Sequence, residues 1–107
     1  MSEIIGYFHS KAFDCKVAVH KARYQTLNKT SNTGNTAIFL KDADTGEPIA
    51  KLSVNTGVPL HLNEFVCKNY AENKVIAKEA FASGLFEDTG VLVTVGFCEC
   101  PIWAIKE

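Results

Sequence analysis

The sequence predicts an α+β fold, a small antiparallel sheet of about five or six strands with one helix packed on one face. Two observations lead to this prediction. Short apolar segments alternate with turn-forming residues along the chain, and residues 73–84 show helical rather than strand periodicity. Hairpins combined with a single helix are most simply accommodated by an antiparallel sheet that is covered on one side.

The N-terminal third is expected to contribute one strand. Residues 1–12 form either a short edge strand or a flexible arm. From Phe13 apolar and polar residues alternate, which predicts a half-buried strand that extends to Tyr24. A helix is the alternative, because this segment also contains good helix formers. Residues 28–35 carry no hydrophobic side chain and many turn formers, which predicts an exposed loop.

The middle of the chain predicts a β-hairpin. Residues 36–40 and 49–54 are apolar, and the eight residues between them, Lys41 to Pro48, include the turn formers Asp, Gly and Pro. Residues 60–66 then predict a short extended segment.

One amphipathic helix of about three turns is predicted between Asn73 and Gly84. Its apolar residues recur near helical spacing, and its lysines face outward. We expect the Asn73 side chain to cap the first turn, and Gly84 to adopt the left-handed conformation after the last turn.

The C-terminal part predicts a turn and two strands. Residues 87–90 predict the turn, and residues 91–95, which are apolar on both faces, predict a central strand. Pro101 interrupts the pattern, so residues 102–105 are expected to form a final edge strand.

Length and composition indicate one domain covering residues 1–107. A chain of this size buries roughly 65% of its surface on folding, and its 47% hydrophobic content excludes general disorder. The net charge of −1 argues against direct nucleic-acid binding, which requires a surplus of basic residues, and against a mimic of DNA. No apolar run is long enough to span a membrane, and the first residues do not resemble a signal peptide. We therefore expect a cytoplasmic protein without membrane partners.

The chain contains four cysteines, which we expect to be reduced thiols that pack as small apolar side chains. The spacing Cys98-x-Cys100 differs from that of zinc motifs, and no histidine lies at a ligand spacing from it. We therefore predict neither a metal site nor a cofactor.

No catalytic constellation is recognisable. The chain has no nucleophile elbow and no glycine-rich phosphate loop. Its acidic pairs lie in predicted turns, where solvated carboxylates do little acid–base work. Cys67 and His61 have no spacing that places them together. We therefore predict a protein that is not an enzyme and name no catalytic residue.

Ligand binding is the favoured class of function. Backbone N–H groups at the start of the predicted helix suit a phosphate, and Tyr or Trp rings suit a planar base. Each polar candidate also has a local structural role as an alternative, such as capping or closing a turn. The candidate ligand-binding residues are Tyr24, Asn55, Tyr70, Asn73, Thr89 and Trp103.

Several short stretches resemble uncharacterised small proteins of tailed phages and integrated mobile elements, a domain of unknown function. Residues 1–32 lie outside the resemblance. The similar stretches are Asn35–Leu40, Asp44–Asn55, Asn69–Asn73, Gly84-Leu85, Thr89-Gly90 and Gly96–Pro101.

The resemblance implies a counter-defence protein of the bacterial host cytoplasm. One mechanism is sequestration of a nucleotide-derived immune signal, often at a homo-oligomer interface. The alternative is an anti-CRISPR-like protein–protein inhibitor that blocks a host defence nuclease or effector through an exposed apolar patch. A small enzyme that degrades the signal is the third hypothesis, and the missing acid–base set argues against it. A protein that sequesters a nucleotide makes only a few contacts with phosphate, so the near-neutral net charge is compatible with this mechanism.

Overall fold

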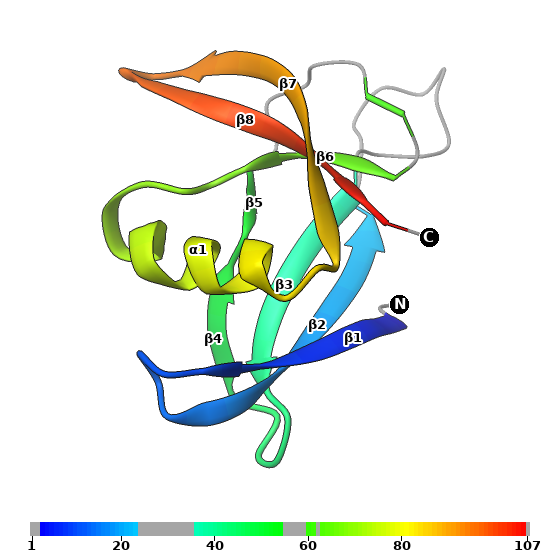
Figure 1. The fold of residues 1–107 in the computed structure, drawn as a ribbon, viewed down its shortest axis with the longest axis vertical. Coiled ribbons are helices and arrows are strands. Elements are labelled where there is room, and N and C mark those ends of the chain that lie inside the picture. The colour runs from blue at the N-terminus through cyan, green and yellow to red at the C-terminus, as the bar shows by residue number, and fades with distance from the viewer. Residues whose placement is uncertain (1–2, 24–35, 55–59, 62, 107) are drawn as a thin grey trace.

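The computed structural model describes residues 3–23, 36–54, 60–61 and 63–106. These residues form two antiparallel sheets of four strands each and one α-helix (Figure 1). The first sheet has the strand order β1 (Glu3–Ser10), β2 (Cys15–Arg23), β3 (Thr36–Asp42) and β4 (Pro48–Lys51). The second has the order β5 (Ser53–Val54), β6 (Glu64–Cys67), β8 (Cys98–Ile105) and β7 (Phe86–Val95).

The prediction of an α+β fold is confirmed, but the prediction of one sheet with five or six strands is wrong. The chain leaves the first sheet and enters the second at Leu52, which is fully buried between β4 and β5. The Leu52 N–H donates to the carbonyl of Ile38 in the first sheet, and the Leu52 carbonyl accepts from Lys68, just after β6. The segment predicted as one strand, residues 49–54, is therefore divided between two sheets. The local alternation of apolar and polar residues does not indicate this division.

In the first sheet one open alternative is decided and one prediction is confirmed. β1 pairs along its length with β2, so residues 3–10 form an edge strand rather than an arm. The predicted hairpin is formed by β3 and β4, and its turn is closed by Asp42, whose carboxylate accepts hydrogen bonds from two following N–H groups. The predicted loop at residues 28–35 lies outside the described residues.

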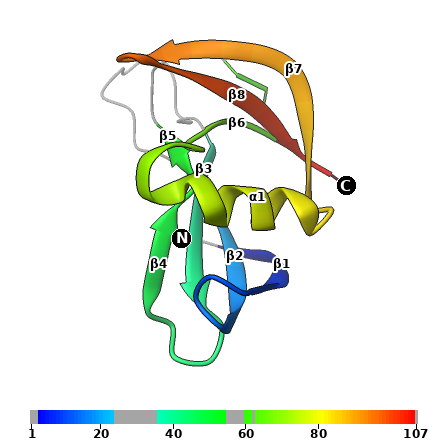
Figure 2. The same cartoon turned by 60° about the vertical axis from the view of Figure 1, so that its left-hand side comes forward.

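The predicted helix is α1 (Lys74–Ala82), which follows a 3₁₀ turn, η1 (Ala71–Asn73). Gly84 has a φ of 84°, as predicted for a left-handed residue after the last turn. The capping prediction is wrong for the Asn73 side chain: its amide donates instead to the carbonyl of Lys51 at 2.8 Å. α1 packs between β1 and β7 (Figures 1 and 2). No helix in the described ranges is long and apolar enough to cross a membrane.

The predictions for the C-terminal strands are wrong in their order. β7 lies at the edge of its sheet, and β8 lies inside, between β6 and β7. Residues 87–90 form no turn, because they belong to β7; the pairs Asp88–Trp103 and Leu92–Pro101 are regular, and the residues between Asp88 and Leu92 form a bulge. A proline inside a sheet is tolerated beside a bulge, since the ladder is interrupted there.

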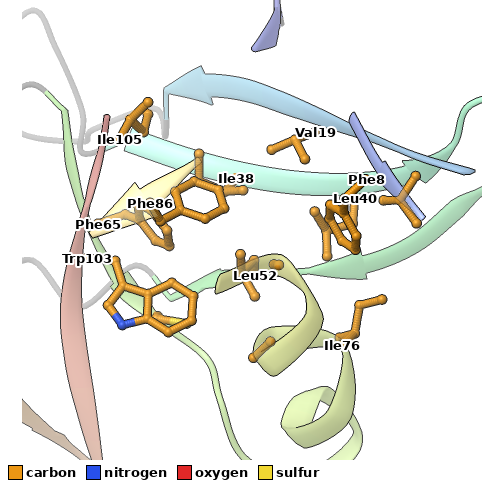
Figure 3. Close-up of a cluster of buried hydrophobic side chains, with 14 residues drawn as sticks. Phe8, Val19, Ile38, Leu40, Leu52, Phe65, Ile76, Phe86, Trp103 and Ile105 are labelled. Carbon is orange, nitrogen blue, oxygen red and sulfur yellow. The ribbon is translucent and has the colours of Figure 1, made fainter. Parts of the chain in front are cut away.

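The main core is built from both sheets and the helix (Figure 3). Phe65, Phe86 and Trp103 form an aromatic cluster, with ring centroids between 5.3 and 6.2 Å apart. α1 contributes Ile76 and other buried residues on one face. A smaller cluster around Val66, Cys100 and Ile102 covers the other face of β8. The main core leaves an adjacent face of α1 available for the site described next.

Candidate functional site

A cavity of about 470 Å³ lies beside the exposed face of α1, where the helix approaches the start of β7 and the end of β8. Cavities of this size accommodate small organic ligands. Its lining combines two cations, one carboxylate, one amide and two aromatic rings. The lining residues are Asn69, Lys74, Ala77, Lys78, Phe81, Ala82, Asp88 and Trp103.

Helix periodicity brings three of the lining side chains together. Lys74, Lys78 and Phe81 are four and three residues apart, and side chains at these spacings share one helix face. The adjacent face of α1 is held in the core by Ile76, Ala77 and Ala80. The two ammonium groups and the phenyl ring therefore project from a helix whose position is set by packing.

A second restraint on α1 comes from Glu79. Its carboxylate accepts hydrogen bonds from the Ser10 hydroxyl at 2.7 Å and from the N–H groups of Lys11 and Ala12, at 2.6 and 3.4 Å. Partial burial alone raises the pKa of Glu79, but these three hydrogen bonds, together with nearby His9, outweigh it and hold the pKa below its ordinary value. This contact joins α1 to the turn between β1 and β2.

The aromatic wall of the cavity consists of one buried and one exposed ring. Trp103 is only 6% exposed, because the Phe86 ring stacks on it at 6.0 Å and the Phe81 ring lies 4.9 Å away. Phe81 is 40% exposed. A planar ligand would therefore contact Phe81, whereas Trp103 supports Phe81 from behind.

The indole N–H of Trp103 remains available as a donor. Its nitrogen lies on the side of the ring away from Leu52 and Ile76 (Figure 3). No residue in the described part of the chain accepts a hydrogen bond from it, and no described side-chain polar atom is both buried and unpaired. The N–H is thus a free donor on a ring that lines the cavity.

The charges in the cavity favour an anion. Within the described residues, no carboxylate lies within ion-pairing distance of Lys74 or Lys78. One oxygen of the Asp88 carboxylate accepts the Gly90 N–H at 2.8 Å, which ties this acid to the bulge of β7. Two cations against one carboxylate leave a positive balance, and the Asn69 amide adds neutral hydrogen-bonding capacity.

One of the six predicted binding residues, Trp103, lines the cavity, and three others have structural roles. Asn73 bonds to Lys51, and the Thr89 hydroxyl donates to the Ile102 carbonyl at 2.8 Å within the bulge. Tyr70 packs against the smaller core cluster. Tyr24 and Asn55 lie outside the described residues.

Sequence reasoning missed Lys74, Lys78, Phe81 and Asp88 as site residues. A signal for the first three exists in their helical spacing, which groups two lysines and one aromatic residue on one face. Phe81 was assigned to the apolar face by the same periodicity. Asp88 carries no such signal, because it reaches the cavity as the cross-strand partner of Trp103, which is distant in sequence.

The cysteines offer little chemistry. Burial raises the pKa of the Cys67 thiol far above its ordinary value, and burial also raises the pKa of Cys100. Protonated, buried thiols are poor nucleophiles and metal ligands. In the described part of the chain, no group of three or more His, Cys, Asp or Glu residues is arranged to hold a metal ion.

Comparisons with protein families, with curated proteins and with solved structures find no match to this chain.

Proposed function

We propose that this protein is a non-enzymatic binding protein that sequesters a nucleotide-derived signal in the cavity beside α1. The observation that carries this proposal is the convergence of Lys74, Lys78 and Phe81 in one cavity, with no carboxylate in the described structure paired to either lysine. Phosphate and a flat ring are the two chemical features that such a set recognises together.

Each part of a nucleotide has a counterpart in the lining. The ammonium groups of Lys74 and Lys78 suit the phosphate, and the exposed ring of Phe81 suits the base. The Asn69 amide and the free oxygen of Asp88 are available to polar groups of the base or sugar. The volume of about 470 Å³ is in the range of small-ligand sites.

Binding without turnover is favoured by the composition of the same lining. It contains one carboxylate, Asp88, and neither histidine nor cysteine among its described residues. General acid–base catalysis most often uses histidine, and metal-assisted cleavage needs a set of metal ligands; the described lining offers neither. We therefore assign the protein a stoichiometric role, in which one ligand is held per cavity and released unchanged.

The resemblance to small phage and mobile-element proteins supplies the biological role in this proposal. A protein that removes a nucleotide signal from solution would silence a host defence that depends on that signal. The amount of protein made in the cell, rather than a catalytic rate, would then set the strength of the effect.

The proposal is tested by incubating the protein with a panel of linear and cyclic adenosine and guanosine nucleotides. We expect at least one to be retained by the protein during ultrafiltration and to return intact to solution after heat denaturation. A cleaved product would identify an enzyme instead. Failure of every nucleotide to bind, with a host effector co-purifying, would instead identify the protein–protein inhibitor.

Matched variants locate the site. Replacing both Lys74 and Lys78 by Gln should weaken binding about tenfold per lysine, as expected for the loss of a partly exposed charge–phosphate contact. The control replaces Lys11 and Lys106 by Gln, which makes the same change in net charge at exposed residues outside the cavity. Equal losses in both double variants would contradict the assignment of the cavity.

A further inference from the structure

The first sheet has one face in the core and one face that carries cations and rings. α1 covers the core face, where Val17, Val19 and Leu40 belong to the main core together with residues of the helix (Figures 1 and 2). Because successive side chains of a strand point to opposite faces, the residues that alternate with these point away from the helix. We call that side the outer face of the first sheet; it includes Tyr7, Lys16, His20, Phe39, Lys41 and Lys51.

Strand pairing brings rings and cations of the outer face together from different strands. His20 of β2 pairs directly with Phe39 of β3. In the adjacent row, Ala18 of β2 pairs with Tyr7 of β1 on one side and with Lys41 of β3 on the other. Paired residues on one face of a sheet have neighbouring side chains, so aromatic and basic groups are interspersed on one surface.

Two interactions show cations beside rings on the outer face. The Lys16 ammonium lies 4.5 Å from the centroid of the Tyr7 ring, and Tyr7 remains 49% exposed. Burial lowers the pKa of His20, and the positive charge of Lys41 lowers it further, so the imidazole beside Phe39 is a neutral ring at pH 7. Within the described ranges, neither Lys16 nor Lys41 forms an ion pair with a carboxylate.

The carboxylates of the same strands lie on the other side of the sheet. β1 to β4 contain Glu3 and Asp42, and the strand pairing places both on the core side. Burial raises the pKa of the Cys15 thiol, which packs against the main core, and three nearby carboxylates raise it further, those of Asp42, Asp14 and Asp44. The net charge of −1 is an average over the whole chain and does not show this separation of charges.

We propose that the outer face of the first sheet binds a single strand of nucleic acid. Bases stack on aromatic rings presented by a sheet, and phosphates bind cations that stand between the rings. A duplex hides the faces of its bases, and an acidic peptide has no need of the rings of Tyr7 and Phe39. The single strand is therefore the occupant that the rings and the charge both favour. Because neither contact depends on the sugar, DNA and RNA are expected to bind alike.

The test is fluorescence anisotropy of labelled oligo(dT) and oligo(U) of about ten nucleotides, titrated with the full chain. We expect dissociation constants of about 1–100 μM at physiological salt, the range of non-specific binding. Replacing Lys16 and Lys41 by Gln should weaken binding about tenfold and reduce the slope of log affinity against log salt by about 0.7 per lysine. Tyr7→Leu should weaken binding about tenfold, whereas Tyr7→Phe keeps the ring and should bind like the wild type.

The matched control replaces Lys74 and Lys78 by Gln, which makes the same change in net charge at the cavity beside α1. It should bind both oligonucleotides like the wild type. The proposal is overturned if neither oligonucleotide binds, if the two double variants lose equal affinity, if Tyr7→Leu binds as tightly as the wild type, or if a duplex of the same length binds as tightly as the single strand. Displacement of the oligonucleotide by polyglutamate at equal charge would also overturn it. No residue of the first sheet lines the cavity, so this readout does not depend on the proposed function.

Discussion

Replacing Glu79 by Gln tests how the helix that carries the site is held. The carboxylate accepts three hydrogen bonds from Ser10 and the turn that follows β1. The Ser10 hydroxyl in turn accepts a hydrogen bond from the Phe13 N–H at 3.1 Å. The substitution keeps the shape of the side chain and removes its charge. One amide nitrogen then replaces an acceptor, so at least one bond is lost.

The size of the effect follows from the contacts. Hydrogen bonds to a charged group contribute about 1.5–3 kcal/mol and neutral ones about 0.5–1.5 kcal/mol. Because Glu79 is only partly buried and one of its bonds is long, we expect a loss of about 1–2 kcal/mol, at and just below the lower end of the charged range. For a domain of this size each kcal/mol corresponds to a fall in Tm of about 4–8 °C.

The lowered pKa of Glu79 determines how its contribution to stability changes with pH. The folded protein holds the pKa of Glu79 below the ordinary value of 4.5, so the unfolded chain binds the proton more readily. The stabilisation is therefore complete above that ordinary value and is lost as the pH falls through the folded pKa. The variant has no carboxyl at this position and should lack that part of the acid destabilisation.

The assay is urea unfolding at pH 7 and at pH 3.5, with Glu47→Gln as the control. Glu47 lies in an exposed turn, and its substitution removes the same charge. We expect Glu79→Gln to be less stable than the control at pH 7 and the difference to shrink at pH 3.5. Equal stability of the two variants at pH 7 would refute the role given to Glu79.

Three further outcomes are expected. Phe81→Ala should reduce nucleotide affinity at least tenfold in calorimetry while lowering stability by about 1–2 kcal/mol, less than the loss of a fully buried phenylalanine; unchanged affinity would exclude stacking. Gly84→Ala should lower the free energy of unfolding by about 1 kcal/mol, because φ is positive there; an unaltered urea midpoint would contradict this. Cys67 should resist alkylation in the native protein and react after unfolding, as mass spectrometry can show; rapid native labelling would be the contrary result.

Local patterns were sufficient to predict several elements. The β3–β4 hairpin has apolar segments around a turn closed by Asp42, and α1 ends at Ala82, two residues before the left-handed Gly84, so both depend on residues close in sequence. The division into two sheets depends instead on Leu52, whose neighbours in space come from β3 and from the residue after β6. The interior position of β8 likewise depends on its pairing with β6, which is distant in sequence.

The site was predicted only at Trp103, and there with a different role. The Trp103 ring was expected to stack on a ligand. In the structure Phe86 and Phe81 pack against this ring, so its faces are occupied by other side chains. Asn73 and Thr89 were predicted as ligand contacts; in the structure their side chains donate to backbone carbonyls, and neither residue lines the cavity. The convergence of α1 with the start of β7 is a property of tertiary packing, so the spacing of Asp88 relative to Lys74 gave no indication of it.

The most direct test of the central claim uses the single tryptophan of the chain. Its indole N–H gives one resolved proton resonance, which can be followed by NMR while a nucleotide is added, with the phosphorus spectrum of the ligand recorded over time. Binding at this cavity predicts that the resonance shifts and saturates at one nucleotide per chain, while the phosphorus signals show no new product. An indole resonance that stays in place, or the steady growth of a cleavage product, would contradict the account.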